Sequence, residues 1–242
     1  RRENGYHDVR MVMQSIYLYD EVKIAKKKEP GITLTTNLKF LPTGDGNIAY
    51  KAAQLLMDEF DLKEGVQITL NKHIPVAAGL AGGSSNAAAV LFGMNRLFGL
   101  RLTQQELMDR GVKLGADVPY CIMRGTVLAE GIGEELSVLP AMPKCTVLIA
   151  KPPISVSTKM VYEALDSKEI VEHPDIDGIL EGLRKGDLHK VADSMGNVLE
   201  DVTIPMHPVI ADIKQVMQDC GAIGAMMSGS GPVSYTHLTL PT

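Results

Sequence analysis

The sequence predicts an α+β protein with two lobes. Over the first 150 residues, segments with the alternation and β-branched content of strands are interspersed with segments of helical periodicity. After Pro152-Pro153, four helical stretches separated by polar or proline-containing linkers precede a last strand. Strands with interspersed helices, followed by a helix-richer half, are typical of an α+β chain in two packed units.

Composition and charge restrict the class of protein. Of the 242 residues, 45% are hydrophobic and 22% are charged, as in a soluble globular protein, and no apolar run approaches a membrane span. The net charge of −5 argues against a nucleic-acid partner held mainly by phosphate contacts. The three cysteines form no CxxC pair, which favours a reducing cytoplasm and argues against a zinc site. We expect a cytoplasmic monomer or homodimer with no membrane partner and no protein-built metal site.

In the first half, two capping patterns and several extended runs predict the elements. Asn47 is placed to cap a helix that runs to about Phe60. Thr103 and Glu106 form a capping box that starts a helix ending near Gly115. The acidic, glycine-containing segment 130–135 is expected to be a turn. Strands are predicted at residues 9–19, 20–25, 32–36, 66–70, 126–129 and 146–150.

In the second half, apolar periodicity predicts mainly helices. The last predicted strand leads into a glycine turn, Met227-Ser-Gly-Ser-Gly-Pro232. Taken alone, such a turn is a weak functional signal. The predicted elements are helices at residues 158–165, 176–184, 188–199 and 209–220 and a strand at residues 222–227.

The stretch from Pro75 to Leu91 joins the strand at 66–70 to an alanine-rich helix expected at residues 84–98. Its glycines allow positive φ and close approach of a ligand to the main chain. Unpaired N–H groups at a helix start form a site for an anion such as phosphate. The order G-x-x-G-G-S-S-N fits neither a Walker loop nor a dinucleotide fingerprint. Such a turn can also serve only to pack a helix on a sheet, but its glycines, serines and asparagine favour phosphate binding.

The string Pro75-Val-Ala-Ala-Gly-Leu-Ala-Gly-Gly-Ser-Ser resembles the ATP-binding motif P-x-x-x-G-L-G/A-G-S/G-S-S of the GHMP kinases. Further matches run in the family's order up to Pro232: Asn4-Gly-Tyr-His7, Leu114-Gly-Ala-Asp-Val-Pro119, Lys151-Pro-Pro-Ile-Ser-Val-Ser-Thr158 and Met227-Ser-Gly-Ser-Gly-Pro232. The resemblance implies a lobe like domain 2 of ribosomal protein S5 over residues 1–145 and a ferredoxin-like lobe over residues 146–232, with the active site between them. It implies ATP contacts from Pro75, Val76, Ala77, Ala78, Gly79, Leu80, Ala81, Gly82, Gly83, Ser84 and Ser85.

The resemblance also implies ATP-dependent phosphoryl transfer with Mg²⁺. Ser84 and Ser85 are candidates for contacts to phosphate or to Mg²⁺, with N-capping alone as the alternative. By spacing, Asp117 is a cap or turn former, but the family's catalytic aspartate occupies its place in G-A-D-V-P. Asp117 is therefore predicted to accept or orient the proton of the substrate hydroxyl. In this family a lysine on the first strand works beside that aspartate, and that strand lies upstream of Arg1.

The matches resemble the branch of the family that phosphorylates a cytidine diphosphate-linked methylerythritol in non-mevalonate isoprenoid biosynthesis. There Tyr6 and His7 are implied to recognise the cytidine ring, although a Tyr-His pair alone is an ordinary surface loop. Tyr162 falls where the family places a second aromatic, so the base is expected between Tyr6 and Tyr162, with a core role for Tyr162 as a close competitor. The other substrate contacts are expected from Thr158, Gly229, Ser230 and Gly231.

Two rivals to this interpretation stay open. The first is another small-molecule kinase of the family, of the homoserine or mevalonate type. The second is a nucleotide-binding protein without catalysis, because the expected lysine strand is not in the chain. The chain opens with Arg1-Arg2, so an N-terminal piece is expected to be missing, and no apolar run marks a signal peptide. Residues 233–242, VSYTHLTLPT, do not continue the family pattern; they are expected to be a foreign or frame-shifted tail and are left out of the fold prediction.

Overall fold

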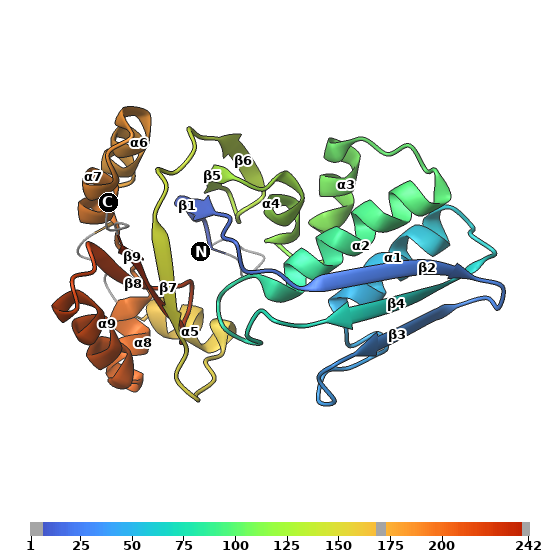
Figure 1. The fold of residues 1–242 in the computed structure, drawn as a ribbon, viewed down its shortest axis with the longest axis horizontal. Coiled ribbons are helices and arrows are strands. Elements are labelled where there is room, and N and C mark those ends of the chain that lie inside the picture. Colours follow the sequence, from blue (N-terminus) through green and yellow to red (C-terminus); the bar gives the residue numbers. More distant parts are fainter. Residues whose placement is uncertain (1–6, 168–172, 239–242) are drawn as a thin grey trace.

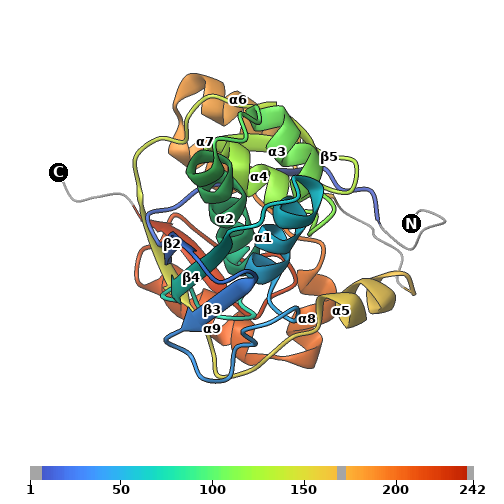
Figure 2. The same ribbon diagram turned by 90° about the vertical axis from the view of Figure 1, so that its right-hand side faces the viewer.

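A three-stranded sheet covered on one face by helices forms most of the first lobe. The computed structural model describes residues 7–167 and 173–238. In the sheet, the central strand β4 pairs antiparallel with β2 and parallel with β3. Figures 1 and 2 show two long helices lying over this sheet. The elements are β2 (Glu21–Lys27), β3 (Ile32–Thr36), α1 (Ile48–Glu59), β4 (Gly65–Asn71) and α2 (Gly82–Phe98).

Local sequence accounts for these elements. Side chains alternate along β4, and the apolar set Val66, Ile68 and Leu70 is buried. Helix α1 begins where predicted, because the side chain of Asn47 accepts a hydrogen bond from the N–H of Ala49. Small and apolar side chains of α1 and α2 pack on the buried face of β4 and form the main core, which includes Ala52, Leu56, Ala87, Val90, Leu91 and Met94.

A second small sheet lies between the first sheet and the C-terminal half of the chain (Figure 1). The turn predicted at residues 130–135 joins two of its strands, as expected, but the second of them was not predicted. That strand is mostly exposed and carries Glu135 and Ser137, which hide its strand character in the sequence. The elements are β1 (Met11–Gln14), α3 (Gln104–Gly111), α4 (Val118–Met123), β5 (Thr126–Glu130) and β6 (Glu135–Val138), with the strand order β1-β5-β6.

The second lobe packs helices against a third sheet of order β7-β9-β8. The helix predicted at residues 188–199 ends earlier, at Ser194, because Met195 is extended; the next helix begins only at Glu200 and was not predicted. None of the described helices is both long and apolar enough to cross a membrane. The elements are β7 (Thr146–Ala150), α5 (Thr158–Leu165), α6 (Ile176–Lys185), α7 (Leu188–Ser194), α8 (Glu200–Met206), α9 (Val209–Asp219), β8 (Gly224–Met227) and β9 (Ser234–Leu238).

Strand β9 comes from the segment that the sequence analysis left out of the fold. It lies at the centre of its sheet, antiparallel to both β7 and β8, so residues 234–238 are part of the folded second lobe. The main chain supplies this pairing whatever the side chains are. Its side chains fit less well, because Ser234 Oγ and His237 Nδ1 are buried without a hydrogen-bond partner. The foreign or frame-shifted origin of this tail stays a prediction, as do the lobe boundaries at residues 145 and 146.

Candidate active site

The loop between β4 and α2 holds an unusual main-chain conformation. Ala77, Gly79 and Ala81 have φ angles of 51°, 67° and 49°. Left-handed geometry is unfavourable for alanine, so the surroundings of the loop must hold it. Helix α2 begins at Gly82, two residues earlier than predicted, and its N-cap Ala81 makes no side-chain capping bond. The N–H groups of the first turn are therefore available to an anion.

Ser84 and Ser85 lie within the first turn of α2 and do not cap it, which excludes N-capping as their role. Ser85 Oγ donates a hydrogen bond to the carbonyl of Gly82, 2.9 Å away. Ser84 Oγ lies 4.0 Å from the point that a Cβ on Gly115 would occupy. The first turn of α2 therefore faces the segment that carries Asp117.

The glycine loop is joined to the turn that follows β8. Ser228 Oγ donates to the carbonyl oxygen of Gly79 over 2.7 Å. A Cβ on Gly79 would overlap the carbonyl oxygen of Ser228, and a Cβ on Gly229 would lie in van der Waals contact with Gly79, 3.8 Å away. Glycine at position 79 is therefore required both by its positive φ and by the close approach of the second chain segment.

The predicted substrate residues Thr158 and Ser230 are brought together by the fold. Their hydroxyl oxygens are 2.8 Å apart, although α5 and the glycine turn are distant in sequence. Two further side chains hold the turn. The hydroxyl group of Thr203 donates to the carbonyl of Ser230. Asn197 Nδ2 donates to the carbonyls of Met227 and Gly229, at 2.9 and 2.8 Å. With the Ser228–Gly79 hydrogen bond, the Thr158–Ser230 contact links residues 228–231 to both the loop and α5.

Asp117 stands directly before α4, at the N-cap position, but its side chain makes no capping bond. Burial raises the pKa of its carboxyl group. The carboxylate also acts on two neighbours: together with burial, the larger cause, it raises the pKa of the Cys121 thiol to about 12 and raises the pKa of the Tyr162 hydroxyl. Asp117 is therefore a poorly solvated carboxyl group that acts electrostatically on Tyr162 and makes no capping bond to α4.

Helix α5 brings its aromatic side chain to the N-terminal segment. The ring of His7 stacks on that of Tyr162, and His7 Nε2 lies 2.5 Å from Asp166 Oδ1. The predicted pair of Tyr6 and Tyr162 is not seen here, because Tyr6 lies outside the described residues. Asp166 was not singled out in the sequence, where it is one acidic residue at the end of a helix.

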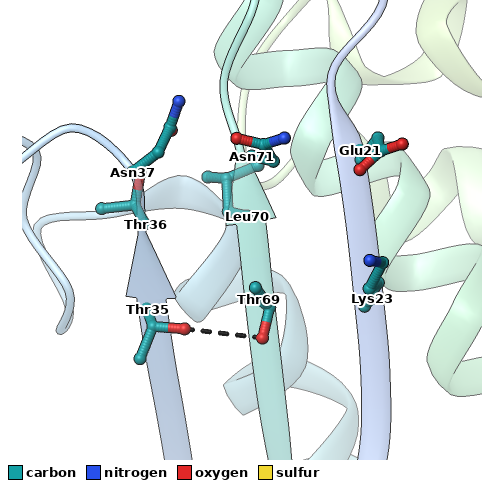
Figure 3. Close-up of a pocket in the computed structure, with 8 residues that line it drawn as sticks. All are labelled: Glu21, Lys23, Thr35, Thr36, Asn37, Thr69, Leu70 and Asn71. Atoms are coloured by element: carbon teal, nitrogen blue, oxygen red, sulfur yellow. Dashed lines mark hydrogen bonds between the residues drawn. The ribbon is translucent and has the colours of Figure 1, made fainter.

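A surface groove lies away from this site. It has a volume of about 320 Å³ and contains none of the predicted site residues. In Figure 3, Lys23, Thr35 and Thr69 line it from three neighbouring strands, β2, β3 and β4. These residues alternate with core residues of the same strands, so the groove lies on the face of the sheet that α1 and α2 leave uncovered.

A buried polar cluster beneath the glycine loop also escaped the sequence analysis. It joins Asp20, Lys72 and Asn86, of which only Asn86 was noted, as part of the helix start. The available signal was a charged residue directly before β2 and another directly after β4. Their proximity follows from the antiparallel register, in which Glu21 pairs with Asn71.

Comparison with known families gives matches over both lobes. Residues 47–125 match the GHMP kinases N terminal domain, and residues 179–236 match the GHMP kinases C terminal region. The chain is 59% identical over 235 residues to a protein of Lachnospira eligens named 4-diphosphocytidyl-2-C-methyl-D-erythritol kinase, covering 97% of this chain and 82% of that protein. A protein of the same name from Lachnoclostridium phytofermentans is 55% identical, with 97% and 81% covered.

Solved structures agree with these matches. A crystal structure of 4-(cytidine 5'-diphospho)-2C-methyl-D-erythritol kinase superposes with a TM-score of 0.83 at 31% identity, over 98% of this chain and 83% of that one. A homoserine kinase from Cytophaga hutchinsonii superposes with a TM-score of 0.77 at 23% identity, over 91% and 76% of the two chains. The second likeness shows the shared fold alone.

Proposed function

This chain belongs to the GHMP kinases, among the 4-diphosphocytidyl-2-C-methyl-D-erythritol kinases, and we propose that it transfers the γ-phosphoryl group of ATP to the 2-hydroxyl of 4-diphosphocytidyl-2-C-methyl-D-erythritol. The reaction is a step of non-mevalonate isoprenoid precursor biosynthesis. The observation that carries the proposal is the position of Asp117, which stands directly before α4 on the segment that faces the first turn of α2.

The loop 75–81 and the start of α2 are proposed to hold the phosphates of ATP. Their fit rests on three features: uncapped N–H groups at the helix start, left-handed residues that turn the main chain, and glycines that keep side chains away. A methyl group at position 82 would come within 2.9 Å of Ile74 Cγ2, so the main chain is packed tightly from below. The contribution of this region is electrostatic and geometric, as phosphoryl transfer requires.

Asp117 is proposed to act on the acceptor hydroxyl. The substrate oxygen forms a bond to the γ-phosphorus, the bond from that phosphorus to the β,γ-bridging oxygen breaks, and ADP leaves. The proton of the hydroxyl passes to the Asp117 carboxylate, or is oriented by it. The raised pKa of Asp117 makes its ionised form a stronger base than an ordinary aspartate.

The cytidine ring is proposed to bind at His7 and Tyr162, with Tyr6 completing the site. The stacked rings offer an aromatic surface, and the imidazole can hydrogen-bond to a base edge. Thr158 and the turn residues Gly229, Ser230 and Gly231 are proposed to contact the rest of the substrate, because the Thr158–Ser230 contact places them between α5 and the glycine loop. In this proposal, Thr158 and the turn residues lie between the cytidine site at His7 and Tyr162 and the phosphate site at the glycine loop.

Mg²⁺ is proposed to bind with ATP and to neutralise charge on the transferred phosphoryl group. Of the residues present, the hydroxyl groups of Ser84 and Ser85 fit this role, as oxygen ligands beside the proposed phosphate site. Within the described ranges, no group of three or more histidine, cysteine or acidic side chains gathers in metal-binding geometry. The ion is therefore proposed to be held chiefly by the nucleotide.

The test is an ADP-release assay on the full-length protein with three acceptors: the cytidylyl substrate, homoserine and mevalonate. ATP binding is measured in parallel by calorimetry, so that binding and turnover are separate readouts. We expect turnover with the cytidylyl substrate only. ATP binding without phosphorylation of any acceptor would leave the phosphate site standing and overturn the substrate. Turnover with homoserine or mevalonate alone would assign the chain to another activity of the family.

A further inference from the structure

A buried network of three polar side chains lies beneath the glycine loop. Only 1% of the Asp20 side chain and 5% of the Lys72 side chain are exposed, and Asn86 is 3% exposed. Asp20 Oδ2 forms an ion pair with Lys72 Nζ and accepts a hydrogen bond from Asn86 Nδ2 at 2.8 Å. Lys72 Nζ also donates to Asn86 Oδ1 at 3.0 Å. Each of the three side chains thus contacts both others.

This network ties the two ends of the loop to each other. The second oxygen of Asp20, Oδ1, accepts hydrogen bonds from the main-chain N–H groups of His73 and Ile74, at 2.6 and 2.8 Å. These two residues directly precede the loop, whereas Asn86 lies in the second turn of α2, directly after it. A single carboxylate therefore holds the entry of the loop and the helix that follows it.

The region between these ends has little room to adjust. Ala77 and Ala81 hold left-handed φ angles that alanine rarely adopts. A Cβ on Gly82 would lie 3.2 Å from Lys72 Nζ, so the helix start rests almost directly on the ammonium group. The network therefore supports the strained loop. The conformation of the loop's main chain depends on these three side chains.

The ionisation of Asp20 is consistent with a satisfied network. Burial alone pushes the pKa of its carboxyl group upward, but the hydrogen bonds from Lys72, Ile74, His73 and Asn86 together outweigh burial, and the pKa lies below its ordinary value. Buried ion pairs of this kind are weak evidence for stability, since apolar residues often replace them without loss. A role in geometry explains the network better than a role in stability.

We propose that Asp20, Lys72 and Asn86 are positioning residues for ATP: they hold the two ends of the loop at the spacing that points the N–H groups of α2 at the phosphates. The proposal rests on the proposed function only in taking this loop as the ATP site. The hydrogen bonds that join the three side chains to one another and to the main chain involve neither Asp117 nor Tyr162. The effect of the network is therefore expected on the nucleotide and not on the acceptor.

The test uses Asp20→Asn and the double variant Asp20→Asn with Asn86→Asp. In the single variant, the new amide group meets Lys72 Nζ and Asn86 Nδ2, so donors face donors. In the double variant, the carboxylate stands at position 86, where it accepts from Lys72 and from the amide introduced at position 20. The amide oxygen at position 20 still accepts from the two main-chain groups. Glu64→Gln is the matched control, because it removes an exposed 2.8 Å ion pair with Lys26 beside the same sheet.

Calorimetry of ATP binding and the two KM values are the readouts. We expect Asp20→Asn to weaken ATP binding about tenfold or more, with the KM of the acceptor within about twofold. The double variant is expected to recover most of the affinity, and Glu64→Gln to leave it unchanged. A merely structural role would lower the folded fraction and leave the ATP affinity of the folded protein unaltered.

Several outcomes would overturn the proposal. One is an ATP affinity of Asp20→Asn within about twofold of the parent; another is a double variant as weak as the single one. If Asp20→Asn does not fold, Asn86→Ala replaces it, because this change leaves the Asp20–Lys72 pair in place, and unaltered ATP binding would then decide against the network. No ATP binding by the parent protein would overturn the ATP site and this proposal together. ATP binding without turnover would overturn only the substrate.

Discussion

The imidazole ring of His7 stacks on the phenol ring of Tyr162, with centroids 4.8 Å apart and planes inclined by 28°. Asp166, directly after α5, holds the edge of that imidazole through Nε2. The N-terminal segment is thereby attached to the second lobe at the place proposed for the cytidine ring. Tyr162 is partly buried and also packs against the hydrophobic core of the second lobe. The same side chain therefore contributes to the core and to the proposed base site.

Tyr162→Ala is expected to raise the KM of the cytidylyl substrate about 10- to 100-fold, because base stacking on an aromatic ring contributes about 1–3 kcal/mol. The KM of ATP is expected to change less than about threefold, because the phosphate loop is untouched. Steady-state kinetics with each substrate varied in turn measures both. Tyr162→Phe is the control, since it keeps the ring and removes only the hydroxyl. Equal effects of the two variants would contradict the stacking role.

Asp117→Asn is expected to lower kcat about 10²- to 10⁴-fold with unchanged ATP affinity, the usual loss for a positioned proton acceptor. The base acts in its ionised form, and burial raises its pKa. Activity is therefore expected to fall, on acidification, at a higher pH than an ordinary aspartate would give. A pH profile of kcat that shows no such acid limb would argue against Asp117 as the base.

The same substitution is expected to stabilise the fold. A carboxyl group whose folded pKa is raised contributes stability at low pH, and this contribution is lost as pH rises through the folded pKa. At neutral pH the ionised Asp117 thus destabilises the fold, and asparagine removes that effect. Thermal unfolding at about pH 7.5 should show a higher Tm for Asp117→Asn, and the difference should shrink as the pH falls through the raised pKa of Asp117. A lower Tm at neutral pH would contradict this.

Gly79→Ala is expected to destabilise the protein by about 2–5 kcal/mol, from a left-handed φ and from overlap with the Ser228 carbonyl. Gly99→Ala is the matched control, because Gly99 has a similar φ of 62° at the end of α2 with nothing within 4 Å of the added methyl group. It should cost only about 1–2 kcal/mol. Urea unfolding measures both. If both variants lost the same free energy of unfolding, the overlap with the Ser228 carbonyl would not contribute.

His237 is expected to make the second lobe sensitive to acid. Burial lowers its pKa, so the folded state keeps it neutral while the unfolded state takes up a proton below about pH 6.5. Stability is therefore present above that pH and is lost as pH falls through the folded pKa. Tm is expected to drop as the pH falls below about 6.5 in the parent and to drop less in His237→Leu. His189→Gln, at an exposed position on α7, should behave like the parent.

Most elements could be predicted from the sequence because their signals are local. The caps at Asn47 and Thr103 act over two or three residues, and the alternation along β4 is complete within seven. The start of α2 was placed two residues late, because serines normally cap helices, and here the left-handed Ala81 ends the loop instead. Strand β9 was left out because residues 233–242 do not continue the family pattern, yet their main chain pairs with both β7 and β8.

By itself, the sequence determined the family, the glycine-rich loop and the candidate residues Asp117, Thr158 and Tyr162, since each lies within or beside a short motif. Only the tertiary structure decided which of them meet: Thr158 with Ser230, and Tyr162 with His7. It also revealed the network in which Asp20 reaches Lys72 and Asn86, 52 and 66 residues away. The physical reason is the sequence separation over which each interaction acts. Capping and alternation are interactions of near neighbours, whereas these contacts exist only once strand register and helix packing have brought distant segments together.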